Sequence, residues 1–143
     1  MIYRQTLAIF SVLIISLTAT ASDLVVVINK LNPIESLTKS QVIDIYMGRF
    51  LTFPDGSPAQ PLDLQSNSEL KEKFYLTLVN QNERKVNAYW SRLLFSGRAK
   101  PPLEVSSIEE ALQQVIDAKS KMAYIPQSAV THSVKVVFRF DQN

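Results

Sequence analysis

The sequence predicts a three-layer α/β domain, in which a small mixed sheet lies between helices. An uninterrupted apolar run at residues 24–28 is typical of a strand that is covered on both faces. Segments with helical spacing of apolar residues follow this run, and two more strand-like runs, at 122–125 and 134–140, come near the end of the chain. Strands interleaved with helices in this way predict a sheet flanked by about four helices.

The first helix is expected to begin after Thr38. Thr38 and Gln41 form a capping box, in which each side chain accepts a hydrogen bond from the other residue's backbone N–H group. Leu37 and Val42 are placed for the hydrophobic staple that often accompanies such a box. Gly48 stands where a left-handed residue would end the helix. These signals predict a short helix with one buried face.

The second helix is expected to begin within residues 66–69, Ser-Asn-Ser-Glu. Ser66 and Glu69 form a second S-x-x-E capping box. The apolar positions that follow are four residues apart: Leu70, Phe74 and Leu78. Before this helix, the Pro-Asp-Gly-Ser-Pro sequence within residues 52–61 favours an irregular turn, and residues 62–64 favour a short strand.

Two further helices have recognisable starts. Asn82 is the expected N-cap of the third helix, and Gly97 is expected to end it. Its apolar face consists of Val86, Trp90, Leu93 and Leu94, so we expect Trp90 to lie in the core. Either Ser106 or Ser107 caps the fourth helix, because each is followed three residues later by a glutamate. The expected buried face of that helix is Ile108, Ala111, Leu112, Val115 and Ile116.

The last strand alternates between apolar and more polar positions. The first set is Val134, Val136, Phe138 and Phe140, and the second is Lys135, Val137 and Arg139. Alternation indicates a strand with one face in the core, so we expect this strand at an edge of the sheet or with one exposed face.

The N-terminus has the pattern of a secretory signal peptide. Arg4 supplies a positive charge, residues 7–17 are mostly apolar, and Ala19-Thr20-Ala21 fits a small-x-small cleavage site. A membrane anchor is the alternative, but the apolar core is shorter than the ~20 residues of a spanning helix. We therefore expect residues 1–21 to be removed, residues 22–143 to form one periplasmic domain, and no stable membrane span to remain.

The composition of the mature chain excludes several classes of protein. Removal of residues 1–21 leaves 143 − 21 = 122 residues, and the Lys+Arg count falls from 15 to 14 against 13 Asp+Glu. A nearly neutral chain with scattered cations gives no support for nucleic-acid binding. The chain has no cysteine, so a hydrophobic core rather than disulfide bonds must hold the fold. This length is sufficient for one such core.

Several stretches resemble the phosphate-type solute-binding proteins of ABC transporters. The main stretch is residues 37–50, LTKSQVIDIYMGRF, which follows the apolar run at 24–28 and Asn32-Pro33. Residues 53–56, FPDG, resemble a W-x-D-G loop of that family, and residues 121–125, KMAYI, resemble its g-A-I-G-Y-v strand. The resemblance covers roughly residues 24–138 and depends on the order and spacing of these motifs.

The resemblance implies a type 2 periplasmic-binding-protein fold, of which this chain would form a single lobe. Two-lobed members of this class close around their ligand by hinge motion between two domains. Since 122 residues make about one domain, we expect a short, single-lobe member.

The resemblance also implies an anion site at Ser66, Asn67 and Ser68, where the second helix begins. Free backbone N–H groups and the positive end of the helix dipole favour an anion there, and the serine hydroxyls add donors. The alternative is that Ser66 and Glu69 only cap the helix, and Glu69 would repel an anion.

This site departs from the family pattern of an arginine four residues before a Ser-Gly-Thr triplet. The arginine position is Leu62 if residues 66–68 are the triplet and Leu64 if residues 68–70 are. The glycine position is Asn67 or Glu69 accordingly. The missing arginine removes the bidentate partner of a phosphate, so any phosphate binding is expected to be weak.

The sequence gives no positive support for catalysis. His132 is the single histidine, cysteine is absent, and no G-x-S-x-G nucleophile turn occurs, so neither a usual zinc site nor a serine triad is indicated. We expect a non-enzymatic protein without catalytic residues, metal or cofactor. Tyr89, Arg92 and Phe95 are candidates for a partner surface, with the margin of an ordinary core as the alternative.

These observations predict a secreted periplasmic solute-binding protein for a small phosphate-like anion, linked to ABC transport. The alternative is a non-enzymatic envelope interaction or scaffold protein that uses the lobe to bind a protein partner, or a second copy of itself.

Overall fold

The computed structural model describes residues 23–140. The elements follow in the order β1 (Leu24–Asn29), α1 (Lys39–Tyr46), β2 (Gln60–Leu64), α2 (Glu69–Val79), α3 (Glu83–Phe95), β3 (Leu103–Val105), α4 (Ile108–Asp117), β4 (Lys121–Pro126), the 3-10 turn η1 (Gln127–Ala129) and β5 (Val134–Arg139). The expected signal peptide at 1–21 lies outside the described residues. Within residues 23–140, no helix has the length and apolar character needed to cross a membrane.

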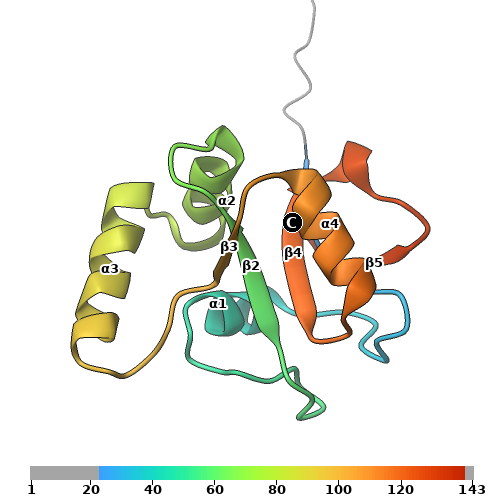
Figure 1. Ribbon diagram of the computed structural model, residues 1–143, viewed down its shortest axis with the longest axis horizontal. Helices are drawn as coiled ribbons and strands as arrows, with labels where there is room; N and C mark the ends of the chain where they lie inside the picture. Colours follow the sequence, from blue (N-terminus) through green and yellow to red (C-terminus); the bar gives the residue numbers. More distant parts are fainter. Residues whose placement is uncertain (1–22, 141–143) are drawn as a thin grey trace, which may run out of the picture.

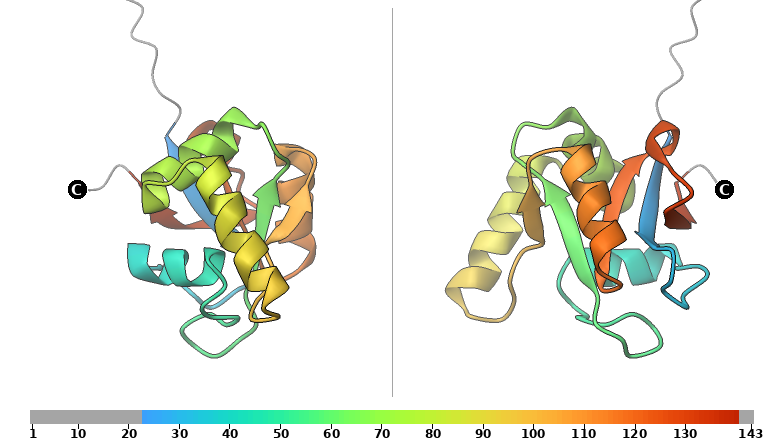
Figure 2. Two further views of the ribbon diagram at one scale, coloured as in Figure 1. Left: turned by 90° about the vertical axis from the view of Figure 1, so that its left-hand side faces the viewer. Right: turned by 45° about the vertical axis from the view of Figure 1, so that its right-hand side comes forward.

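The five strands form one mixed sheet in the order β3-β2-β4-β1-β5. β2 runs parallel to β3 and β4, whereas β1 is antiparallel to β4 and β5. α4 covers one face of the sheet, α1 and α2 cover the other, and α3 packs on the outside against α2 (Figures 1 and 2). The predicted three-layer arrangement is confirmed. The three-residue strand β3 is an element that the sequence pattern did not predict.

The core is centred on β1 and on the helices that cover it. All six residues of β1 are buried, which confirms the prediction from its apolar run. Between the sheet and α1 and α2 lies a cluster of aromatic rings, in which Phe74 and Tyr124 stack with ring centroids 3.8 Å apart. Tyr46 meets Phe74 edge to face at 4.6 Å. Burial of such large rings is a major source of stability in a domain of this size.

Most of the predicted helix ends are confirmed. The capping box of Thr38 and Gln41 is present, and Gly48 after α1 has a left-handed backbone with φ of +72°. Asn82 caps α3 through its side chain. Of the two candidates for the cap of α4, the structure uses Ser107.

α2 begins within the expected residues 66–69, but the predicted capping box of Ser66 and Glu69 is wrong. Ser68, not Ser66, is the N-cap, because its hydroxyl accepts a hydrogen bond from the backbone N–H of Lys71 at 3.4 Å. Asn67 has a left-handed backbone with φ of +66°, which turns the chain between the two serines. Glu69 is consequently the first residue of the helix rather than a capping-box partner of Ser66.

β5 lies at an edge of the sheet as predicted, but strict alternation along it is wrong. Val26 pairs with Phe138 and Val27 with Val136, so Val137 is the extra residue of a β-bulge. Val137 is buried, and its carbonyl accepts a hydrogen bond from the N–H of Leu37 at 2.8 Å. The bulge thus joins the edge strand to the loop before α1.

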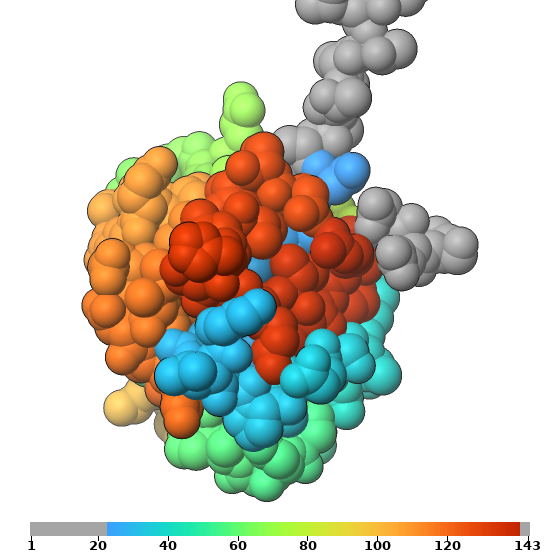
Figure 3. All heavy atoms as spheres, turned by 90° about the vertical axis from the view of Figure 1, so that its right-hand side faces the viewer, coloured from blue at the N-terminus to red at the C-terminus, as the bar shows by residue number. Residues whose placement is uncertain are grey.

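That loop is also tied to β5 by Lys135. The Lys135 Nζ atom donates to the backbone carbonyl of Asn32 at 2.6 Å and lies 3.0 Å from Glu35 Oε1. Figure 3 shows this side of the molecule, where the loop, in light blue, lies against β5, in red.

The buried face of α4 is narrower than predicted. Ala111 and Val115 are buried, whereas Ile116 is 38% exposed. Because α4 lies alone on its face of the sheet (Figure 2), side chains at the margin of its apolar stripe have no second helix to cover them.

Both ends of the domain emerge at the same end of the sheet. Leu24 pairs with Pro126 at the C-terminal end of β4, and Val25 pairs with Arg139 at the end of β5. Because β2 is parallel to β4, Leu64 at the end of β2 lies toward this end as well. The turn that leads from β2 into α2 therefore lies toward the end of the sheet at which the chain enters β1 and leaves β5.

Candidate functional site

The turn between β2 and α2 holds all three residues of the predicted anion site. Ser66 and Asn67 are exposed, and Ser68 is half-buried as the N-cap of α2. The Ser68 hydroxyl oxygen accepts the hydrogen bond from the Lys71 N–H. The first-turn N–H groups of Glu69 and Leu70 have no intrahelical acceptor, as at the start of any α-helix. The turn therefore offers backbone donors and two hydroxyl groups to a small ligand.

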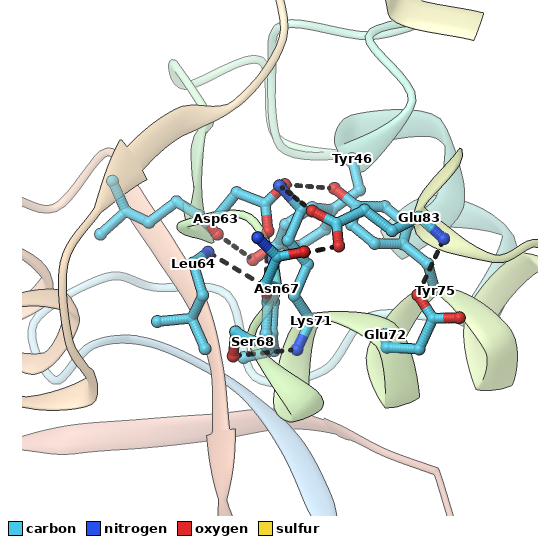
Figure 4. A network of polar contacts seen from close by, with 11 residues as sticks. Tyr46, Asp63, Leu64, Asn67, Ser68, Lys71, Glu72, Tyr75 and Glu83 are labelled. Carbon is cyan, nitrogen blue, oxygen red and sulfur yellow. Dashed lines mark hydrogen bonds and ion pairs between the residues drawn. The ribbon is translucent and has the colours of Figure 1, made fainter. Parts of the chain in front are cut away.

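A buried ion-pair network lies directly behind this turn. Lys71 Nζ is 3.5 Å from Asp63 Oδ2 and 3.6 Å from Glu83 Oε1. The side chains of Lys71 and Asp63 are only 7% and 9% exposed, whereas that of Glu83 is 15% exposed. Figure 4 shows these three side chains, which come from α2, β2 and α3, meeting beside Asn67 and Ser68. One ammonium group is therefore shared by two carboxylates.

Asp63 is held by two tyrosine hydroxyl groups as well as by Lys71. Tyr124 donates to Asp63 Oδ1 at 2.5 Å, and Tyr75 donates to Oδ2 at 2.8 Å. Burial raises the pKa of the Asp63 carboxyl above its usual range, although these hydrogen bonds and the Lys71 charge oppose that shift. Burial also raises the pKa values of Tyr75 and Tyr124, and the Asp63 charge adds to the shift, so both hydroxyls stay protonated donors.

Glu83 places a carboxylate of the chain itself at the candidate anion site. Its Oε2 atom accepts a hydrogen bond from the backbone N–H of Asn67 at 3.2 Å. The backbone N–H of Glu83 in turn donates to Glu72 Oε2 at 2.8 Å. One of the donors that an external anion would use is therefore occupied.

The surface around the turn is rich in negative charge. An open groove of about 610 Å³ runs beside Asn67 and Ser68, and its charged lining consists of three carboxylates, Glu69, Glu72 and Glu83, and one ammonium group, Lys73. The negative charges of these carboxylates oppose the entry of a doubly charged anion. Glu72 and Glu83 therefore add to the repulsion of an anion that was predicted for Glu69.

Sequence reasoning missed the buried triad of Asp63, Lys71 and Glu83. A signal existed for Lys71, because it lies three and four residues before the buried Phe74 and Tyr75 on the apolar face of α2. Asp63 likewise stands between the buried residues Leu62 and Leu64 of β2. The pairing of these charges depends on contacts between separate elements, which a sequence pattern does not show.

Of the other candidate residues, Trp90 lies beside this site, because it lines a pocket of about 400 Å³ together with Ser66, Asp63 and Lys71. His132 is exposed in the turn before β5. Trp90 is 6% exposed, which confirms its predicted place in the core, and the Tyr89 hydroxyl donates to the carbonyl of Met47 at 2.6 Å. Phe95 is 99% exposed. In the described part of the chain, no group of three or more histidine, aspartate or glutamate side chains is arranged to hold a metal ion.

Comparison with known proteins shows the fold through solved structures. No protein-family model and no curated protein sequence matches the chain. An ABC-type phosphate transport receptor from Vibrio cholerae matches 80% of this chain with a TM-score of 0.64 and 18% identity, over 45% of its own chain. A putative phosphate ABC transporter substrate-binding protein from Clostridium perfringens, solved with bound phosphate, matches 80% of this chain with the same TM-score and identity, over 44% of its own chain. PstS from Borrelia burgdorferi gives a TM-score of 0.62 at 12% identity, covering 80% of this chain and 46% of its own.

These matches confirm the resemblance at the level of the fold. The chain has the mixed α/β fold of the periplasmic phosphate-binding proteins. It spans less than half the length of each of these solved structures.

Proposed function

We propose that the chain is a secreted, non-enzymatic solute-binding protein that holds a small polar solute at the turn before α2. The observation that carries the proposal is the exposed turn of Ser66, Asn67 and Ser68 at the start of α2. The matched solved structures support it, because they include a phosphate transport receptor and a putative substrate-binding protein of a phosphate ABC transporter. A link to ABC transport is part of the proposal.

Phosphate binding by this site is weak. Leu62 and Leu64 stand at the positions where the family pattern has its arginine, and a single lobe does not enclose the ion. Glu83 already accepts the Asn67 N–H, so phosphate would have to compete with an internal carboxylate. An open site with backbone and serine donors competes poorly with water, and we expect a dissociation constant of about 1 mM, or roughly −4 kcal/mol.

Isothermal titration of residues 22–143 with phosphate, sulfate and small organic anions tests the proposal. The variant Ser66→Ala/Ser68→Ala should lose the binding. The matched control Ser36→Ala/Ser40→Ala changes two exposed serines near the start of α1 and should bind as the wild type does. Micromolar phosphate binding by a monomer would contradict the weak site, and the absence of any bound solute would favour the alternative role of an envelope interaction protein.

Replacement of Glu83 by glutamine should strengthen anion binding at this site. The variant removes one negative charge beside the Asn67 N–H and leaves Lys71 paired with Asp63 alone. A change of about 1 kcal/mol, or a several-fold lower phosphate dissociation constant, is expected for one partly exposed charge. Glu109→Gln, in the first turn of α4, is the matched control. Equal phosphate affinities of the Glu83→Gln and Glu109→Gln variants would show that Glu83 does not obstruct the site.

Export is proposed from Arg4, the apolar residues 7–17 and Ala19-Thr20-Ala21. N-terminal sequencing of the exported protein should begin at Ser22. A chain that retains Met1 in a membrane fraction would contradict a periplasmic location.

A further inference from the structure

Exposed apolar side chains gather around the segment that leads from α3 to β3. A groove of about 500 Å³ lies between the loop after α1 and the segment that leads from α3 to β3. Leu51, Leu94 and Leu103 line it and are 73%, 52% and 43% exposed. Gln60 and Pro61, at the start of β2, form part of its wall, whereas Ser66 follows the opposite end of that strand. The groove nevertheless adjoins the candidate solute site, because Leu94, Pro101, Pro102 and Glu104 also line a pocket of about 400 Å³ that contains Ser66.

The helix beside this groove is only partly covered. α3 packs against α2 and presents its outer side to solvent, as the left-hand view of Figure 2 shows. Phe95, the last residue of α3, is 99% exposed and adjoins Leu94 of the groove. Phe95 is therefore an exposed apolar projection that lies one residue beyond the groove-lining Leu94. An exposed apolar surface of this kind marks an interaction site more often than an isolated exposed residue does.

The groove contains charges of both signs. Lys100 and Glu104 both line it. Among residues 23–140, the ion pairs involve Arg49, Lys71 and Lys135 and do not include these two side chains. In a twofold-symmetric pair, residue i of one copy meets residue j of the other, and j meets i. One such arrangement would pair Lys100 with Glu104 twice.

We propose that this groove binds a second copy of the chain in a twofold-symmetric dimer, with Phe95 of each protomer in the groove of the other. Phe95 follows the groove-lining Leu94, and both charges of the pair line the same groove, so one patch of the chain supplies both sides of an isologous contact. The nearly neutral mature chain, with 14 Lys+Arg and 13 Asp+Glu after loss of residues 1–21, adds no net repulsion between copies. The dimer leaves the groove beside Asn67 and Ser68 uncovered, because none of the contact residues lines that groove. Leu94 and Glu104 also line the pocket that contains Ser66, so the contact borders the proposed solute site.

Sedimentation of the mature protein over a range of concentrations tests the dimer. A contact built around a few side chains belongs to the small, weak class of interfaces, so dimers should form with a dissociation constant on the order of 10–100 μM. Phe95→Ser should weaken the dimer by at least about tenfold without unfolding the protein, because this side chain is exposed. Leu31→Ser, which removes another exposed apolar side chain in the loop after β1, should leave the dimer unchanged.

Reversing the charges of Lys100 and Glu104 tests whether the groove binds a second copy of the chain. Lys100→Glu and Glu104→Lys should each weaken self-association, because each places like charges opposite one another. An equimolar mixture of the two variants should recover dimers, since the glutamate introduced in one variant would then face the lysine introduced in the other, and the native pair would form at the second contact. Monomers throughout the concentration range, dimers insensitive to Phe95→Ser, or a mixture that stays monomeric would overturn the proposal. A different protein bound at this surface of a monomeric chain would overturn it as well.

Discussion

Replacement of Lys71 by methionine tests the buried triad behind the proposed solute site. Lys71 Nζ lies 3.5 Å from Asp63 and 3.6 Å from Glu83. At an effective dielectric constant of about 20, each pair corresponds to a gross attraction of roughly 4–5 kcal/mol, much of which offsets the cost of burying the ammonium group. Removing one partner of a buried pair typically costs about 3–5 kcal/mol. Glu83 can hydrate more readily than Asp63 can, so the loss should be near the lower end of that range.

Urea unfolding, followed by the fluorescence of Trp90, measures this loss directly. Trp90 is the single tryptophan of the chain and is buried, so its emission reports unfolding of the core. The double variant Lys71→Met/Asp63→Asn removes the stranded carboxylate and should recover part of the lost stability, which keeps the test informative if Lys71→Met alone does not fold. A loss below about 1 kcal/mol in Lys71→Met, or a double variant no more stable than the single one, would refute the reasoning.

Three further changes test the core, one tight contact and the titration of Asp63. Trp90→Ala should lower the free energy of unfolding by about 3–5 kcal/mol in urea unfolding, because a large buried ring is removed; a loss below about 1 kcal/mol would place Trp90 at the surface. Gly48→Ala should cost more unfolding free energy than Gly56→Ala: both glycines have left-handed backbones, but only at Gly48 would the new Cβ lie 2.7 Å from the Trp90 ring. Equal losses in thermal unfolding would show that the ring yields to the methyl group. Burial raises the pKa of Asp63 in the folded protein above its ordinary value of about 4, so the folded protein binds this proton more tightly than the unfolded chain does. The free energy of unfolding, relative to that of Asp63→Asn, should therefore increase as the pH falls from the raised pKa toward about 4. A pH-independent difference between the two proteins in urea unfolding would contradict the raised pKa.

Local signals in the sequence were sufficient for most of the fold. The capping box at Thr38, the cap at Asn82 and the apolar run of β1 act within a few residues, so their sequence patterns predict the observed elements. The capping residue of α2 was mispredicted because Ser66 and Ser68 are both suitable caps. The choice between them depends on the left-handed turn at Asn67.

The parts that sequence reasoning missed depend on distant partners. β3 has three residues and follows two prolines, and it is a strand because it pairs with β2. The bulge at Val137 depends on its pairing with β1. The predicted site lies at the start of a helix, as its sequence signals indicate, but the electrostatics of this turn depend on Glu83, which belongs to the next helix. The sequence pattern of one segment does not indicate which carboxylate from another segment will contact it in the folded protein.

The neighbouring positions of the domain's two ends make this lobe a portable unit. Val25 and Arg139 are paired across adjacent antiparallel strands, so the chain enters and leaves the domain at nearly one point. A domain with this arrangement can be spliced into a surface loop of a host protein without stretching the host or cutting through its own core. The start of α2 lies toward the same end, so a host would hold the proposed solute site near its own surface. Insertion into a host would thus place host side chains opposite the exposed turn at Ser66, and different hosts would provide side chains of different chemistry.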